Sequence, residues 1–153
     1  MEKEVSSLEL RYLEKEFQKL KGARVDKIYS RNKKDIFIQF YKAELKKPLL
    51  RLFAPNVSYI TSYKPKFGHP DSFTTALRKR LTNAILKDIS QIGHERILKI
   101  TFEKKDGSIF KEIPLYVEFF LKGNIILLDD IKRIDILAEQ QRWSERTIKP
   151  KEE

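Results

Sequence analysis

The stretch ILKITFEKKDGSIFKEIPLYVEFFL, residues 97–121, decides the fold. In its first half Leu98, Ile100 and Phe102 alternate with polar residues, which is the period of a strand with one buried face. The dipeptide Asp106-Gly107 is a turn signal between two such runs. The stretch is therefore predicted to be a β-hairpin.

The second strand of this hairpin carries large apolar groups on both faces. Its predicted inward residues are Leu115, Val117, Phe119 and Leu121, and its predicted outward residues are Tyr116, Glu118 and Phe120. Either the strand is central and covered on both sides, or Phe120 belongs to an interface. The turn Gly123-Asn124 then leads into a further strand from Ile125 to Leu128.

The residues before the hairpin extend the same pattern. A capping box, Ser6 to Glu9, begins a helix that ends at Gly22. Strands are predicted at Arg24 to Tyr29, Ile36 to Phe40, Leu49 to Phe53 and Tyr59 to Tyr63, and a second helix runs from Asp71 or Ser72 to about Asn83. Short turns join successive strands, so the chain is predicted to be α+β, with an antiparallel meander flanked by helices.

The composition favours a polyanionic partner. The 153 residues include 32 Lys and Arg against 22 Asp and Glu, which gives a formal net charge of +10, and 41% are hydrophobic. That apolar share is enough for a folded core. Ten excess positive charges favour nucleic acid or an anionic membrane surface over a neutral metabolite.

A search for catalytic chemistry finds no candidate. The absence of cysteine excludes disulfides, thiolate metal sites and a cysteine nucleophile. His69 and His94 are not at metal-ligand spacing, and no phosphate-binding glycine loop or nucleophile elbow is present. We therefore expect no catalytic residue, no metal and no cofactor. With no signal peptide and no apolar stretch that spans a bilayer, we expect a cytoplasmic protein.

Basic residues cluster at several places along the chain. They are Lys46-Lys47, Arg78-Lys79-Arg80, Lys104-Lys105, Lys132-Arg133, and Arg142 with Arg146. On the second predicted helix, Arg80 falls close to the apolar ridge of Phe73 and Leu81. Its guanidinium must therefore reach water along the apolar surface, form an ion pair, or contact a phosphate.

Polar groups also gather in Gln91 to Arg96. Gly93 suggests a tight turn that fixes Glu95 beside the Arg96 guanidinium at the margin of the sheet. The arginine could fork onto a phosphate or a base edge, while Glu95 orients it or accepts from an exocyclic amine. The alternative is a local surface ion pair, which contributes little to stability.

Taken in chain order, five segments of the sequence resemble the NFACT amino-terminal domain. This domain opens ribosome quality control proteins such as RqcH and NEMF and is also labelled fibronectin-binding protein A. The segments that carry the resemblance are Ser6 to Arg11, Gly22 to Tyr29, Leu77 to Leu81, Gln91 to Ile97, and Glu118 with Gly123 to Asp129. They cover nearly the whole chain, and archaeal members look most similar.

The resemblance implies a fold like the amino-terminal domain of formamidopyrimidine-DNA glycosylases, a β-sandwich flanked by helices. It also implies tRNA binding on a large ribosomal subunit that a peptidyl-tRNA obstructs, and in full-length relatives the mRNA-independent tailing of stalled chains. An Asp-Arg pair that contacts tRNA in the family matches Glu95 and Arg96. A second motif begins at a glutamate that matches Glu118, although Phe119 and Phe120 depart from it. The nucleic-acid-binding candidates are Glu95, Arg96, Arg78, Lys79, Arg80 and Glu118.

Full-length relatives continue into further domains. We therefore expect residues 1–148 to be a single domain and residues 149–153 to begin a linker, with the remaining domains of the same polypeptide among its partners. An adhesion or oligomerisation module is the alternative. A DNA glycosylase is less favoured, because those enzymes begin with Pro-Glu and use the proline amine as nucleophile, whereas this chain begins Met1-Glu2.

Overall fold

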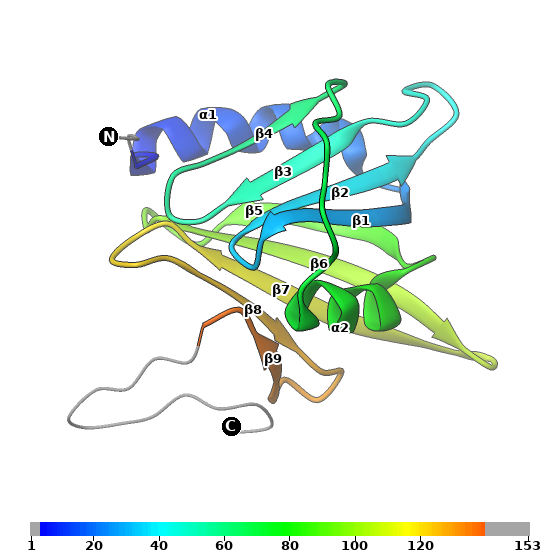
Figure 1. Cartoon of the computed structure of the whole chain (residues 1–153). Coiled ribbons are helices and arrows are strands. Elements are labelled where there is room, and N and C mark those ends of the chain that lie inside the picture. The colour runs from blue at the N-terminus through cyan, green and yellow to red at the C-terminus, as the bar shows by residue number, and fades with distance from the viewer. Residues whose placement is uncertain (1–3, 140–153) are drawn as a thin grey trace.

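A computed structural model describes residues 4–139 of the chain (Figure 1). The helical elements are α1 (Ser7–Phe17), the short 3-10 helix η1 (Gln18–Leu20) and α2 (Ser72–Leu81). The strands are β1 (Arg24–Asn32), β2 (Asp35–Tyr41), β3 (Leu49–Phe53), β4 (Val57–Thr61), β5 (Ile85–Gln91), β6 (Ile97–Asp106), β7 (Ile109–Glu118), β8 (Asn124–Leu128) and β9 (Ile134–Leu137). The predicted linker, residues 149–153, the pair Arg142 and Arg146, and Met1-Glu2 lie outside the described residues.

The strands form one antiparallel sheet in the order β4-β3-β2-β1-β5-β6-β7-β8-β9. Two meanders, β1 to β4 and β5 to β9, are joined where Arg24 of β1 pairs with Ile85 of β5. The sheet folds over so that the first meander lies above the second in Figure 1. This arrangement confirms the predicted antiparallel α+β sandwich.

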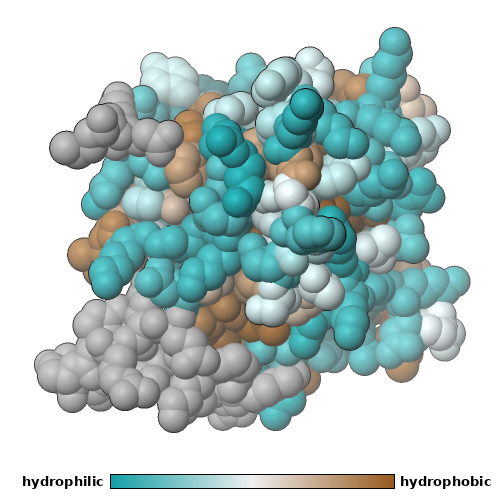
Figure 2. Space-filling model, in the orientation of Figure 1, coloured by the Kyte–Doolittle hydropathy of each residue, from teal (hydrophilic) through white to brown (hydrophobic). Residues whose placement is uncertain are grey.

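The two layers and both helices enclose one hydrophobic core. α1 contacts β4 and β5, and α2 contacts β1 and β9, so each helix bridges two strands that are not neighbours in the sheet. Phe17 of α1 and Leu77 of α2 are completely buried in this core. Hydrophilic residues cover most of the face that Figure 2 shows.

Local sequence explains where both helices begin. The Ser6 hydroxyl accepts from the Glu9 amide at 3.1 Å, and the Glu9 carboxylate accepts from the Ser6 amide at 3.0 Å, so the predicted capping box is confirmed. The Asp71 carboxylate accepts from the Thr74 amide at 2.8 Å and caps α2.

The outer face of β1 to β4 carries a buried ion pair. Asp35, only 2% exposed, accepts from Nε and Nη2 of Arg51 at 2.8 and 2.7 Å. Arg51 also donates to the Tyr59 hydroxyl at 2.9 Å, and its guanidinium lies over the rings of Phe37 and Phe53. The bond to Asp35 raises the pKa of Arg51 above its ordinary value, so the guanidinium is held in its charged form.

The two layers also meet at one end through two turns. Gly123, with φ of +75°, follows the turn after β7, and an added Cβ there would lie 2.5 Å from the Pro55 nitrogen in the turn between β3 and β4. Lys34 donates to the Lys122 carbonyl at 2.7 Å and pairs with Glu139 at 2.7 Å, which joins the β1–β2 turn to the same place.

Several predictions about strands are corrected. β5 and β9 were not predicted as strands, and β4 begins two residues earlier than expected. Leu121 was predicted to point inward but is 66% exposed, because β7 ends at Glu118 and the chain turns there, with the Gly123 amide donating to the Phe120 carbonyl at 2.9 Å. Phe120 is half-buried in that turn and does not belong to a central strand.

Candidate nucleic-acid interface

The turn between β5 and β6 is held by the first turns of α1. The Ser7 hydroxyl donates to the His94 carbonyl at 2.5 Å, and Nη2 of Arg11 donates to the Gly93 carbonyl at 2.7 Å. The Gln91 side chain donates to the Glu95 carbonyl at 2.7 Å. The turn's carbonyl groups are thus occupied, while the side chain of Glu95 is exposed and that of Arg96 is partly exposed.

The turn after β7 lies beside the β5–β6 turn. Glu118 is the register partner of Ile97, and the Phe119 amide donates to the Arg96 carbonyl at 2.8 Å. Sequence motifs more than 20 residues apart, the Glu95-Arg96 pair and the Glu118 segment, are therefore brought together at one end of β6 and β7.

An open groove of about 880 Å³ runs along this junction. Its walls come from the residues before and at the start of α1, from the β5–β6 turn, and from the turn after β7. The lining residues are Glu4, Val5, Ser6, Ser7, His94, Glu95, Arg96, Phe120 and Leu121. We call it the Arg96 groove; it combines a guanidinium, an aromatic ring and a helix N-terminus.

Arg96 forms a surface ion pair with a residue that the sequence did not indicate. Its Nη1 lies 3.0 Å from the Glu4 carboxylate, and the two side chains are 39% and 43% exposed. The predicted partner was Glu95, its neighbour in sequence. No pattern in the sequence indicates the pairing of Arg96 with Glu4, because 92 residues separate the two.

Two of the three basic side chains of α2, Arg78 and Arg80, form hydrogen bonds within the protein. Arg80 pairs with Asp135 of β9 through Nε at 2.5 Å and Nη2 at 3.3 Å, so of the three predicted possibilities the structure has the ion pair. Nε of Arg78 donates to the Ile28 carbonyl of β1 at 2.8 Å. Lys79 is the exposed member of the group.

The structure does not bring α2 to the Arg96 groove. Nζ of Lys104, near the end of β6, donates to the Arg80 carbonyl at 3.1 Å, which places the end of α2 at that end of the strand. Arg96 directly precedes the other end of β6. Seven residue steps separate Ile97 from Lys104, which is about 23 Å of strand.

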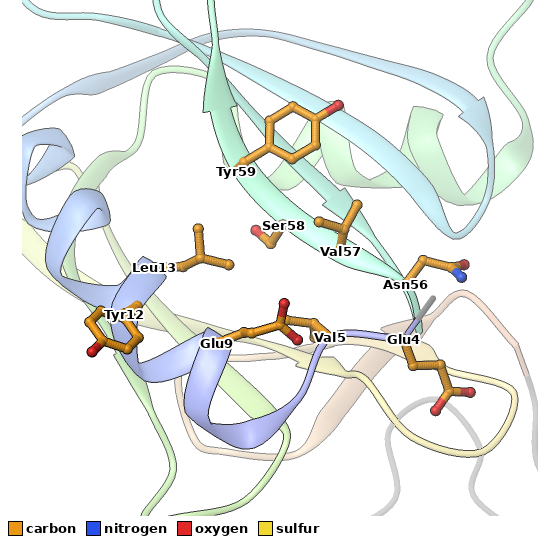
Figure 3. Close-up of a pocket in the computed structure, with 9 residues that line it drawn as sticks. All are labelled: Glu4, Val5, Glu9, Tyr12, Leu13, Asn56, Val57, Ser58 and Tyr59. Atoms are coloured by element: carbon orange, nitrogen blue, oxygen red, sulfur yellow. The ribbon is translucent and has the colours of Figure 1, made fainter. Parts of the chain in front are cut away.

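A second, smaller groove of about 460 Å³ lies between α1 and the edge strand β4. Tyr12 and Leu13 of α1 lie across it from Val57 and Tyr59 of β4 (Figure 3). Its charged lining residues are Glu4 and Glu9, both acidic, so this groove does not suit a polyanion.

Two kinds of site were sought among the described residues, a metal cluster and a membrane-spanning helix. Between residues 4 and 139 no group of three or more His, Asp or Glu side chains is placed to hold a metal ion. Within the same range, no helix combines the length and the apolar character needed to cross a bilayer.

The sequence model described as "NFACT N-terminal and middle domains" matches residues 6–153. The chain belongs to this family. It is similar to the archaeal Rqc2 homolog aRqcH of Methanocaldococcus jannaschii, with 33% identity over 99% of the chain and 23% of the relative. It is also similar to ribosome quality control complex subunit 2 of Saccharomyces cerevisiae, with 33% identity over 88% of the chain and 13% of the relative. The chain thus spans less than a quarter of the curated relatives it matches.

Solved structures of other proteins share the fold. The N-terminal region of the fibronectin/fibrinogen-binding protein of Streptococcus suis superposes with a TM-score of 0.87 at 27% identity, covering 95% of this chain and 58% of that one. The N-terminal domain of the fibronectin-binding protein PavA of Streptococcus pneumoniae gives 0.85 at 24% identity, covering 95% of this chain and 61% of that one. The family model and the sequence relatives confirm the family resemblance, and these structures confirm the fold.

Proposed function

We propose that this NFACT domain is the RNA-binding module of a ribosome quality control factor. Its partner in this role is tRNA on a large ribosomal subunit that a peptidyl-tRNA obstructs. The protein acts in the cytoplasm, and the domain binds rather than catalyses. Together with the remaining domains of the polypeptide, it would support the mRNA-independent tailing of stalled chains.

The observation that carries this proposal is the Arg96 groove. It brings a partly exposed guanidinium and the Phe120 ring together on a domain of net charge +10. An arginine fork can hold a phosphate through two hydrogen bonds or read a guanine edge, and an aromatic ring can stack on an unpaired base. The names of the relatives give the ribosomal context.

Arg96→Ala is expected to weaken tRNA binding by roughly five- to tenfold at low salt, because it removes one charge-assisted contact, and to reduce the salt slope by about 1. The measurement is fluorescence anisotropy of labelled tRNA over a series of salt concentrations. Arg96→Lys keeps the charge without the fork, and should recover the slope but only part of the affinity.

The matched control is Arg24→Ala. Arg24 is an exposed arginine of β1 that follows the far end of α1, and its loss changes the net charge by the same amount. Equal losses for both variants would mean that charge alone drives binding, and an unchanged affinity in Arg96→Ala would refute the proposed site.

Glu4→Gln is expected to raise tRNA affinity by about two- to fourfold. The Glu4 carboxylate holds the guanidinium that a phosphate must reach, and breaking an exposed ion pair costs only about 0–1 kcal/mol. The gain should vanish in an Arg96→Ala background, which a double-mutant cycle measures. A gain that persists without Arg96 would show that Glu4 acts only through long-range repulsion of the RNA.

Adhesion is the second candidate, because the Streptococcus suis relative is named for binding fibronectin and fibrinogen. Its test is binding to immobilised fibronectin with tRNA as competitor. Saturable binding that tRNA does not displace and that Arg96→Ala does not change would favour adhesion.

A further inference from the structure

The imidazole of His94 is in the lining of the Arg96 groove, and the proposed function does not use it. His94 is an exposed residue of the turn between β5 and β6. A neutral histidine donates a hydrogen bond from one ring nitrogen and accepts one at the other. The contacts of the ring decide which of the two nitrogens is the donor.

Helix α1 holds the turn around His94 at three points. Nη2 of Arg11 donates to the Gly93 carbonyl at 2.7 Å and lies 3.4 Å from Nδ1 of His94. The Ser7 hydroxyl donates to the carbonyl of His94 itself at 2.5 Å. The ring and the backbone on both sides of it are thus held before any ligand arrives, which lowers the entropy that binding costs.

The contact with Arg11 determines the tautomer of the imidazole. An arginine side chain has N–H donors and no acceptor, so Nδ1 of His94 is the acceptor in this contact and carries no proton. In a neutral imidazole the proton then lies on Nε2. The reverse orientation of the ring would set a C–H group against the guanidinium instead. Nε2–H is therefore a donor, and within residues 4–139 no hydrogen bond to another residue uses it.

The charges of the groove favour a base over a phosphate as the acceptor for this donor. Among the described residues that line the groove, one is a permanent cation, Arg96, and two are carboxylates, Glu4 and Glu95. Arg96 can hold one phosphate, and the two carboxylates would repel a second. A neutral N–H donor suits a ring nitrogen or a carbonyl on the edge of a base. The Phe120 ring in the same groove can stack on that base.

We propose that His94 binds an unpaired base of the RNA, with Nε2–H donating to an acceptor atom on the base edge. Arg11 is the positioning residue, because its guanidinium fixes both the ring and the tautomer. This inference rests on the proposed function, since it places a base of the same RNA in the Arg96 groove. It adds dependence on base chemistry to a site whose phosphate contacts alone would hold any sequence.

His94→Ala is expected to weaken binding of labelled tRNA by about two- to tenfold, the range for one neutral hydrogen bond. The salt slope should not change, because no charge is removed. His94→Gln carries an amide N–H at the distance of Nε2 from the backbone, and should keep most of the affinity. The shorter amide of His94→Asn reaches only the distance of Nδ1, so this variant should bind as weakly as His94→Ala. A slope reduced by about 1 in His94→Ala, or equal losses in His94→Gln and His94→Asn, would overturn the inference.

An abasic RNA tests whether the contact is to a base. Fluorescence anisotropy compares a short single-stranded RNA of mixed sequence with an abasic oligomer of the same length. His94→Ala should bind the first oligomer more weakly than the wild-type chain does, and should bind the abasic oligomer equally well. An equal loss for both oligomers would place the contact on the sugar–phosphate backbone and overturn the assignment to a base.

NMR spectra that correlate the ring nitrogens with their neighbouring protons test the tautomer and the role of Arg11. At mildly alkaline pH, where histidine is neutral, Nε2 of His94 should be the protonated nitrogen, and an Nδ1–H tautomer would contradict the inference. Arg11→Met removes the hydrogen bond to Nδ1, so the Nδ1 resonance of His94 should shift while that of His69 stays in place. An unmoved resonance would mean that Arg11 does not position the ring.

The matched control is His69→Ala. His69 is also exposed, in the loop before α2, and its loss removes the same side chain. This loop leads into α2, which the structure does not bring to the Arg96 groove, so tRNA affinity should be unchanged. Circular dichroism melting should stay the same in both variants, because both histidines are exposed. An equal loss of affinity in this control would overturn the assignment to His94.

Comparison with Arg96→Ala separates this inference from the proposed function. If Arg96→Ala weakens tRNA binding while His94→Ala does not, the inference is wrong and the function stands. If His94→Ala alone weakens binding, and only for RNA that carries bases, the contact of His94 is supported and that of Arg96 is wrong. If neither variant changes the affinity, both are wrong.

Discussion

Arg51→Ala is expected to lower the free energy of unfolding by about 3–5 kcal/mol, the range for breaking a buried ion pair by removing one partner. The variant leaves the Asp35 carboxylate, 2% exposed, without the two hydrogen bonds of the guanidinium. It also empties the space between the rings of Phe37 and Phe53. Urea denaturation followed by circular dichroism measures the loss.

The double variant Asp35→Leu with Arg51→Met tests the cause. Replacing a buried pair by apolar groups of similar volume is often neutral, so most of the lost stability should return. Arg133→Ala is the surface control, because Arg133 pairs with Asp129 at 3.2 Å with its side chain 38% exposed, and it should cost at most about 1 kcal/mol. A loss in Arg51→Ala no larger than in this control would contradict the prediction.

Gly123→Ala is expected to destabilise the domain by about 2–5 kcal/mol, the sum of a positive φ at a residue with a Cβ and an overpacked contact. The new Cβ would lie 2.5 Å from the Pro55 nitrogen and 2.7 Å from the Ala54 carbonyl carbon. Both are backbone atoms, which cannot rotate away from the new Cβ as the end of a long side chain can. The same urea titration gives the value.

Gly22→Ala separates the two causes. Gly22 also has a positive φ, +87°, but an added Cβ there would meet no atom within 4 Å. Gly22→Ala should therefore lower the free energy of unfolding only by the cost of a positive φ at a residue with a Cβ, about 1–2 kcal/mol. Because Gly123 follows the turn that carries Phe120 and Leu121, Gly123→Ala should also weaken tRNA binding below its melting temperature, whereas Gly22→Ala should not. Equal stability losses at the two glycines would refute the clash.

Features that depend on neighbours in sequence were predicted well. The capping box at Ser6 and the hairpin with its turn at Asp106-Gly107 follow from residues a few positions apart, and the structure has both. β5 was missed because a register shift between Leu86 and Asp88 breaks the alternation. The buried Leu86 and Ile89 are then three residues apart, a spacing that does not indicate a strand.

Features that depend on distant residues were not predictable. The partners of Arg96 and Arg80 are Glu4 and Asp135, which lie 92 and 55 residues away in the chain. Leu121 was predicted to be buried because the alternation of β7 was extended beyond the end of the strand. The sequence does not show where β7 stops pairing with β6. Whether Glu95, Arg96, Arg78, Lys79, Arg80 and Glu118 contact RNA remains a prediction.

The ten-residue strand β6 carries the Arg96 groove before its first residue and the turn at Gly107 after its last. The distance between them is therefore set by a count of residues within a paired strand. Inserting one residue into β6 and one into β7 would turn every side chain between the two insertions to the opposite face. Adding two residues to each strand would instead keep every side chain on its face and lengthen this spacing by about 6.6 Å.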